Sequence, residues 1–381
     1  MWADSLKTEE VAGTLDAVDQ LGGVGWAAPL LSQAASILDR LRVGLTDKDA
    51  YLANPITPAE MSFLFEIRFA RALANARLTA TYEHPAGVGN STVDFRVDLD
   101  PPWLIELVSL HESDAFKAAT WTDGVFHGYL LRTDADDPKQ SEEGEALKAQ
   151  ERIGAKVFDR KHGPIKFPEP DGSVHMVMVD ARGFMGNGHG NAADWRQIIH
   201  RPVGVEHHLV KHWTNPQTGM TAPIRGLFEQ ACPLPAAQVA RDRLHIIGFV
   251  CESSFTKFEI HQQSFYLCNP ARFASEEAAR VTMSQWPLRR QALEKDVPII
   301  VHRGEKIICP DGHLCGSVTE DVHDGDHIKG NFLRIEGAAD AISDEHVGHI
   351  CLVPGCGKAI TEVRDGCFKI HTARGWVGEF P

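Results

Sequence analysis

The feature that most restricts this fold is a run of apolar residues, Val174-His-Met-Val-Met-Val179. A strand that carries apolar side chains on both of its faces must be covered on both, as parallel strands are in α/β proteins. A charged stretch with helical spacing, from Ser141 to His162, precedes this run. The alternation of helix and buried strand predicts an α/β fold.

A capped helix and three short strands are predicted upstream of that run. Thr57-Pro-Ala-Glu60 combines a hydroxyl cap, a proline at the first helical position and a glutamate that can return the hydrogen bond. We therefore expect a helix from Pro58 to about Arg77. Turn-rich segments then separate three β-like runs, Leu78–Tyr82, Thr92–Val97 and Trp103–Leu110.

Length and composition limit the classes of protein that remain. A chain of 381 residues is too long for one ordinary small core, so we expect two or three folded units. A hydrophobic fraction of 43% and a charged fraction of 24% exclude a disordered or fibrous chain. The 38 basic and 52 acidic residues give a net charge of −14, so the chain as a whole repels polyanions. Any contact with nucleic acid must use a local basic patch or bound cations.

The sequence carries no signal for secretion or membrane insertion. Its N-terminus lacks a basic start followed by an apolar stretch, and no apolar run approaches the roughly 20 residues of a membrane helix. We therefore expect a cytoplasmic protein without a membrane partner. Thiols stay reduced in that compartment, so the 8 cysteines are interpreted as core residues or metal ligands before disulfides.

Two carboxylates stand inside otherwise apolar strands. Asp94 lies in Val-Asp-Phe and Glu106 in Ile-Glu-Leu, on strands that a short turn would pair. Such charges are costly unless they are paired or bind a cation, and two adjacent acids suit a hard divalent ion such as magnesium. Glu66 points into the apolar face of the capped helix, so three acids are expected to converge. The alternative is that the acids are edge residues or ion-pair partners of Arg68 or Arg96.

The glutamate-bearing helix and the Val-Asp-Phe and Ile-Glu-Leu strands together resemble the PD-(D/E)XK nuclease-like superfamily, over roughly Pro58 to Asp180. The resemblance implies a restriction-endonuclease-like mixed sheet flanked by helices. It also implies an endonuclease that hydrolyses DNA phosphodiester bonds with Mg²⁺ or Mn²⁺. The metal ligands implied are Asp94, Glu106 and the backbone carbonyl of Leu107.

In this superfamily a lysine two residues after the strand glutamate orients or activates the attacking water. Val108 occupies that position here and can neither donate a hydrogen bond nor carry charge. Either the lysine has migrated to a neighbouring helix, or the protein binds nucleic acid or a protein partner without catalysis. Lys156, Lys148 and Lys117 are the candidates, and we favour Lys156 because Ile153 beside it marks the edge of the core. The expected catalytic residues are Glu66, Asp94, Glu106 and Lys156.

The C-terminal region contains two cysteine pairs, each followed by a glycine, and an Asp-Gly hairpin signal follows each pair. Pairs of this kind on tight turns can hold one structural zinc ion tetrahedrally. The region therefore resembles a small β-rich zinc ribbon, which would recognise a protein partner or nucleic acid. His313, or Cys367 and His371, could replace one ligand, and the alternative is a set of buried thiols. The four cysteines are Cys309, Cys315, Cys351 and Cys356.

Two further rivals to a nuclease remain open. One is a scaffold whose C-terminal region binds another protein. The other is a zinc hydrolase built on His208 and His212, which would lie one turn apart on a helix. The expected organisation is a helical N-terminal arm (1–52), a nuclease-like domain (53–272), a helical linker (273–298) and a zinc-ribbon-like domain (299–381).

Overall fold

In the computed structural model the chain forms two compact units, Met1–Arg290 with Gly378–Phe380, and Gln291–Val377 with Pro381. Each unit is described by itself. The structure describes residues 8–57, 60–86, 89–111, 113–123, 126–129, 141–158, 165–183, 192–200, 212–214, 219–250, 260, 264–288, 306–308, 314–319, 332–336, 359–364, 367–371 and 379–380.

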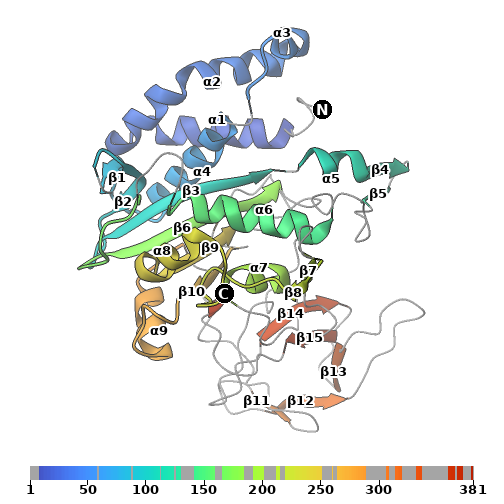
Figure 1. The fold of residues 1–381 in the computed structure, drawn as a ribbon. Coiled ribbons are helices and arrows are strands. Elements are labelled where there is room, and N and C mark those ends of the chain that lie inside the picture. Colours follow the sequence, from blue (N-terminus) through green and yellow to red (C-terminus); the bar gives the residue numbers. More distant parts are fainter. Residues whose placement is uncertain are drawn as a thin grey trace. The chain divides into compact units, whose positions relative to one another are not determined.

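A seven-stranded mixed sheet forms the centre of the first unit, with the order β1-β2-β3-β6-β9-β10-β16 (Figure 1). β2 pairs antiparallel with β1 on one side and with β3 on the other, whereas β3, β6 and β9 are parallel. The predicted α/β fold, a mixed sheet flanked by helices, is confirmed. The strands are β1 (Ala80–Pro85), β2 (Thr92–Val97), β3 (Trp103–His111), β6 (Val174–Gly183), β9 (Ile246–Val250), β10 (Ser264–Cys268) and β16 (Glu379–Phe380).

Strand β6 occupies the middle of this sheet because its side chains are apolar on both faces. It pairs in parallel with β3 on one side and with β9 on the other. All of its residues from Val174 to Ala181 are buried. The prediction of a strand covered on both faces is therefore confirmed.

Helices fill most of the described N-terminal region, where a helical arm (1–52) was expected. α1 (Thr8–Leu21) ends at a glycine pair, and a short 3-10 turn, η2 (Gly25–Ala27), leads into α2 (Ala28–Thr46) and α3 (Lys48–Ala53). One face of α2 is apolar and buried. This face consists of Leu30, Ala34, Ile37, Leu38 and Leu41.

Helix α4 (Met61–Asn75) lies within the predicted range from Pro58 to about Arg77, and the reciprocal bonds of the predicted capping box stand directly before its first residue. The N–H of Thr57 donates to Glu60 Oε2 at 2.7 Å, and the N–H of Glu60 donates to Thr57 Oγ1 at 3.3 Å. The reciprocal bonds satisfy donors that the first helical turn would otherwise leave open. The cap thereby starts the helix that carries Glu66.

Aromatic side chains fill the core on the face of the sheet that α4 covers. Trp103 of β3 stacks on Trp286 with ring centroids 4.8 Å apart and an interplanar angle of 13°. Phe69 of α4 lies 6.4 Å from the Trp286 ring and 5.4 Å from that of Phe95 on β2. Trp286 follows α9 (Glu276–Ser284), so this cluster joins elements that are far apart in the sequence.

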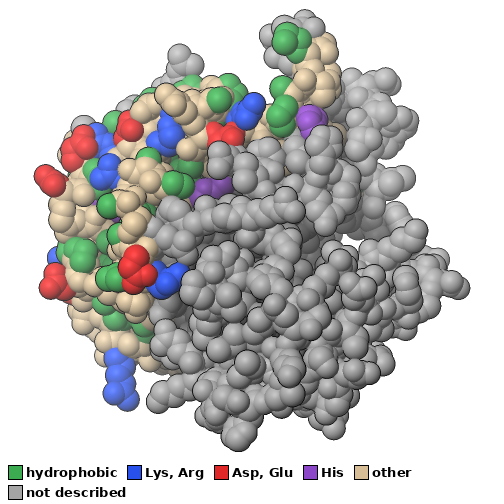
Figure 2. Space-filling model, turned by 90° about the horizontal axis from the view of Figure 1, so that it is seen from below, with side chains coloured by type: hydrophobic (Ala, Val, Ile, Leu, Met, Phe, Trp, Pro, Cys, Tyr) green, Lys and Arg blue, Asp and Glu red, His purple; other side chains and the backbone are tan. Residues whose placement is uncertain are grey.

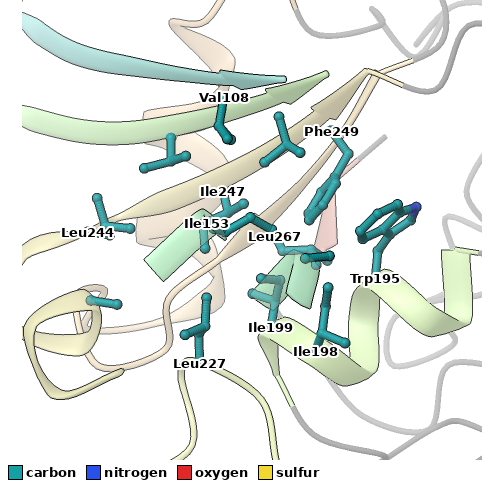
Figure 3. Close-up of a cluster of buried hydrophobic side chains, with 14 of the residues drawn as sticks. Val108, Ile153, Trp195, Ile198, Ile199, Leu227, Leu244, Ile247, Phe249 and Leu267 are labelled. Atoms are coloured by element: carbon teal, nitrogen blue, oxygen red, sulfur yellow. The ribbon is translucent and has the colours of Figure 1, made fainter. Parts of the chain in front are cut away.

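The alternate side chains of the same strands meet a second group of helices. α6 (Glu142–Ala155), α7 (Ala192–Ile199) and α8 (Pro235–Arg243) supply the residues that cover them. Figure 3 shows Val108 of β3 and Ile247 of β9 in this cluster, with Ile153 of α6 and Trp195 of α7. The sheet is thus buried on both faces, which holds β3 rigidly between two cores.

Small elements connect these layers and correct one expectation. His212 begins a strand that pairs with Pro223, so the prediction that it lies on a helix is wrong. His208 lies outside the described residues. Every helix in the described part of the chain falls short of the length and apolar character that a membrane span requires. The elements are α5 (Asp114–Ala119), β4 (Thr120–Asp123), β5 (Phe126–Tyr129), β7 (His212–Thr214) and β8 (Thr221–Pro223).

The second unit contains a five-stranded antiparallel sheet with the order β11-β12-β13-β15-β14. The second predicted hairpin is confirmed, because β14 and β15 pair up to Arg364 and Cys367. Cys315 lies on β12, whereas the other three proposed zinc ligands, Cys309, Cys351 and Cys356, lie outside the described residues. The zinc site therefore stays a prediction. The strands are β11 (Lys306–Ile308), β12 (Leu314–Thr319), β13 (Phe332–Glu336), β14 (Ala359–Arg364) and β15 (Cys367–His371).

Candidate active site

Strands β2 and β3 part where the two predicted acids face each other. Their ladder ends at the pair Phe95–Ile105, and the next positions in the same register are Asp94 and Glu106. There a side chain replaces the strand pairing, because Asp94 Oδ2 accepts a hydrogen bond from the N–H of Leu107 at 2.6 Å. The Asp94 carboxyl is thus fixed against β3 beside Glu106.

Glu106 is fully buried, and one of its carboxylate oxygens contacts two lysine ammonium groups. Its Oε1 lies 3.1 Å from Lys156 Nζ and 2.5 Å from Lys166 Nζ. Its Oε2 is buried and has no hydrogen-bond partner among the described residues. One oxygen of this carboxylate is therefore doubly compensated, and the other is open to a further ligand.

Lys156 reaches Glu106 from the end of helix α6. It caps this helix, and its N–H donates to the carbonyl of Ile153, which is itself buried in the core. Of the other two candidate lysines, Lys148 pairs with Glu145 at 2.7 Å and Lys117 is exposed. Among the three predicted positions, Lys156 is thus the one that the structure brings to the acids.

Lys166 was not anticipated from the sequence. The N–H of Lys166 donates to the carbonyl of Val157 at 3.2 Å, and a β-bridge joins Phe158 to Ile165. The next residue, Phe167, is fully buried. A single lysine between two apolar residues in Ile165-Lys-Phe167 is a signal that could have identified it.

The position of Val108 explains why the ammonium groups at Glu106 come from outside strand β3. Its side chain is 6% exposed and points into the core cluster with Ile153 (Figure 3). An ammonium group there would be buried among apolar side chains, which is strongly unfavourable. Positive charge therefore approaches Glu106 from α6 and from the segment after it.

Glu66 lies on α4 and is buried beside the same group of charges. Its Oε2 accepts a hydrogen bond from the hydroxyl of Tyr82 at 2.7 Å. Burial raises the pKa of Glu66 and the negative charge of Glu106 adds to this, whereas the Tyr82 bond and the charge of Lys156 act in the opposite direction. The third acid thus senses the site electrostatically, and its direct hydrogen bond is to Tyr82.

The charges shift the pKa values of Asp94 and Lys156 in the same direction. Burial, followed by the negative charge of Glu106, raises the pKa of Asp94 to about 8. Burial lowers the pKa of Lys156, but the attraction of Glu106, Asp94 and Glu66 outweighs it, so the net shift is upward. Without a bound cation, Asp94 is therefore largely protonated at neutral pH and Lys156 is charged.

The arginines that could have neutralised the acids have other partners. Arg68 Nη1 lies 3.3 Å from Glu10 Oε1, and Arg96 pairs with Asp98. Among the described residues, the ion-pair partners of Glu106 are the two lysines. The alternative reading of the strand acids as arginine partners is thus not what the geometry shows.

The oxygens of Asp94 and Glu106 are the candidate ligands of a divalent cation. The described residues include no group of three or more His, Cys, Asp or Glu side chains that could hold a metal ion. Two carboxylates do adjoin each other, and the buried Oε2 of Glu106 lacks a partner in this part of the chain. Hard cations accept carboxylate, backbone carbonyl and water oxygens. Asp94 and Glu106 are thus a partial donor set, and the predicted site of these two carboxylates with the Leu107 carbonyl stays a prediction.

Side chains of both charge signs lie on the described part of one face of the molecule. On the described part of the face shown in Figure 2, basic and acidic side chains are interspersed. This agrees with a chain of net charge −14 in which basic side chains gather locally, as Lys156 and Lys166 do at Glu106.

Comparison of the chain with protein-family models, with curated proteins and with solved structures found no significant match to any of them.

Proposed function

We propose that this chain is a divalent-metal-dependent nuclease that hydrolyses DNA phosphodiester bonds. One observation carries the proposal: two lysines from outside β3 converge on Glu106, directly beside Asp94, although Val108 stands at the usual lysine position. The mixed sheet flanked by helices is the architecture that the resemblance to the PD-(D/E)XK superfamily implies.

The proposed roles follow from the position of each group. Asp94 and Glu106 hold the cation, and Asp94 must give up its proton to do so. A bound Mg²⁺ or Mn²⁺ would lower the pKa of a water and stabilise negative charge on the leaving oxygen. Lys156 orients that water from the end of α6, and Glu66, hydrogen-bonded to Tyr82, adds negative charge that keeps Lys156 protonated.

The second candidate is a protein of the same fold that binds nucleic acid or a protein partner without cleavage. The presence of Val108 at the position of the motif lysine favours it. In that case the lysines neutralise Glu106 and no water is activated. A purified chain that retains DNA but leaves it intact would support this alternative.

A pair of lysine variants on one helix tests the nuclease. We expect the wild-type chain to cleave plasmid DNA with Mg²⁺ and to leave it intact in EDTA. Lys156→Met should lower the rate about 100-fold, because the loss of a positioned group that assists proton transfer costs this much. Rates would be measured on gels, with thermal unfolding as a check of folding.

Lys148→Met is the matched control, since Lys148 lies on the same helix and pairs with Glu145 away from the two acids. It should cleave at the wild-type rate. Equal rates for Lys156→Met and the wild type would refute the role of Lys156. Absence of Mg²⁺-dependent cleavage in pure wild-type protein would refute the nuclease.

Metal affinity should depend on pH through Asp94. The carboxyl must lose its proton before it can bind a cation, and its pKa is about 8. Affinity for Mn²⁺ should therefore rise about tenfold per pH unit up to pH 8 and level off above it. Calorimetry in buffers of different ionisation enthalpy would measure both the affinity and the proton released. An affinity that stays constant between pH 6 and 8 would contradict this assignment.

A further inference from the structure

We infer that Lys166 is a phosphate-binding residue of this site. When a divalent cation occupies Asp94 and Glu106, the ammonium group of Lys166 leaves Glu106 and binds a phosphate of the bound nucleic acid. The inference rests on the proposed function and adds a substrate contact to it. It concerns a lysine that the resemblance to known nucleases does not indicate.

Glu106 is surrounded by a local excess of positive charge. The ammonium groups of Lys156 and Lys166 both contact Oε1 of Glu106, at 3.1 Å and 2.5 Å. One carboxylate is neutralised by one cation, so the second ammonium group is surplus to the charge of Glu106. A divalent cation on the same carboxylate would repel both lysines at close range. One of them is then expected to move.

Of the two lysines, Lys166 is held by fewer acids and is the one expected to move. Lys156 is attracted by Glu106, Asp94 and Glu66 together. Lys166 has Glu106 as its one ion-pair partner in the described part of the chain. The two side chains are similarly exposed, 31% for Lys156 and 33% for Lys166, so both could turn toward solvent, and the weaker hold of the acids on Lys166 decides which one moves.

The backbone of Lys166 is fixed, so its side chain can turn from Glu106 to a phosphate without a change in the chain around it. Its N–H donates to the carbonyl of Val157 at 3.2 Å. Phe167 is fully buried, and its ring stacks on His175 with centroids 5.2 Å apart. A lysine on an anchored backbone presents a compact charge on a flexible four-carbon stem, which suits a single phosphate group.

DNA binding in the presence and absence of a cation tests this exchange. Fluorescence anisotropy of a labelled duplex would be measured in Ca²⁺ and in EDTA at several salt concentrations, with the integrity of the DNA checked on gels. In Ca²⁺ we expect Lys166→Met to weaken binding about tenfold and to lower the salt slope by about one. In EDTA, where Lys166 stays on Glu106, the loss should be less than about threefold. Lys166→Arg should restore most of the affinity, and Lys148→Met should match the wild type.

Each other outcome has a defined meaning. Equal losses in Ca²⁺ and EDTA, no loss in Ca²⁺, or failure of the wild type to bind DNA would overturn the inference. The predicted pattern in a protein that never cleaves DNA with Mg²⁺ would support Lys166 and refute the nuclease. Thermal unfolding would show whether Lys166→Met is folded, and Lys166→Gln provides a second neutral variant that keeps a hydrogen-bond donor.

Discussion

Asp94→Asn is expected to abolish metal-dependent cleavage and to stabilise the folded protein at the same time. Asparagine can still accept the hydrogen bond from Leu107, so the local geometry is kept, but it cannot supply the negative charge that a divalent cation needs. The rate should fall at least about 100-fold. Plasmid cleavage with Mg²⁺ would measure this loss.

The gain in stability follows from the raised pKa of Asp94. Burial and Glu106 lift it from an ordinary value of 3.8 to about 8. Between these values the unfolded chain loses a proton that the folded chain keeps, so the group opposes folding increasingly as the pH rises. Below pH 3.8 the effect vanishes, and above pH 8 it is complete. Asp94→Asn removes it. The interval between the two pKa values corresponds to about 5 kcal/mol at pH 8, and relaxation of the site and entry of water reduce this, so the free energy of unfolding should rise by at least about 2 kcal/mol.

Urea denaturation at pH 5 and pH 8 would test this dependence. Asp98→Asn is the control, because Asp98 lies just beyond the same strand in an exposed ion pair with Arg96. It should change cleavage little and stability by less than about 1 kcal/mol. A destabilised Asp94→Asn protein at pH 8 would show that the carboxylate form of Asp94 supports the fold, contrary to our account.

Trp103→Ala is expected to have the largest effect on stability. The side chain is fully buried and stacks on Trp286 at 4.8 Å between α4 and the sheet. Its removal leaves a cavity that the surrounding rings fill incompletely, at a cost of about 3–5 kcal/mol. Chemical denaturation followed by circular dichroism would measure the change.

Two controls separate the loss of the ring from other effects. Trp103→Phe keeps an aromatic ring and removes an indole N–H that has no partner among the described residues, so it should cost less than half as much. Leu52→Ala, at a side chain that is 47% exposed, should be nearly neutral. A cost below about 1 kcal/mol for Trp103→Ala would contradict the packing described here.

The proposed site also explains how a chain with a net negative charge would bind nucleic acid. A protein of net charge −14 attracts a polyanion through local features. A bound divalent cation converts a pair of carboxylates into a phosphate site. Lys166, once released from Glu106, would add a second positive contact at the same place.

Local patterns were sufficient to predict much of the first unit. The capping box at Thr57 and Glu60 predicted helix α4, because this motif lies within four consecutive residues. The apolar run at β6 predicted a strand covered on both faces, because a strand buried on both faces lacks the alternation of apolar and polar residues. Period and capping are properties of neighbouring residues, so they can be read without the fold.

The adjacency of Asp94 and Glu106 could be predicted from the sequence more easily than the positions of the two lysines. A short turn between two strands limits how they can pair, so the two acids were expected to be adjacent. Helix α5 and the strands β4, β5, β7 and β8 were not anticipated, because such short elements carry little periodicity. The helical interpretation of His212 failed since it rested on spacing alone, and a spacing of four residues does not establish a helix.

By itself, the sequence determined that this chain contains a sheet buried on both faces with two acidic side chains in its strands. The tertiary structure decided how those acids are compensated: β2 and β3 separate at Asp94, and Lys156 and Lys166 reach Glu106 from segments 50 and 60 residues away in the chain. The physical reason is that apolar periodicity acts between neighbouring residues, whereas a charge pairs with whatever group folding brings near it.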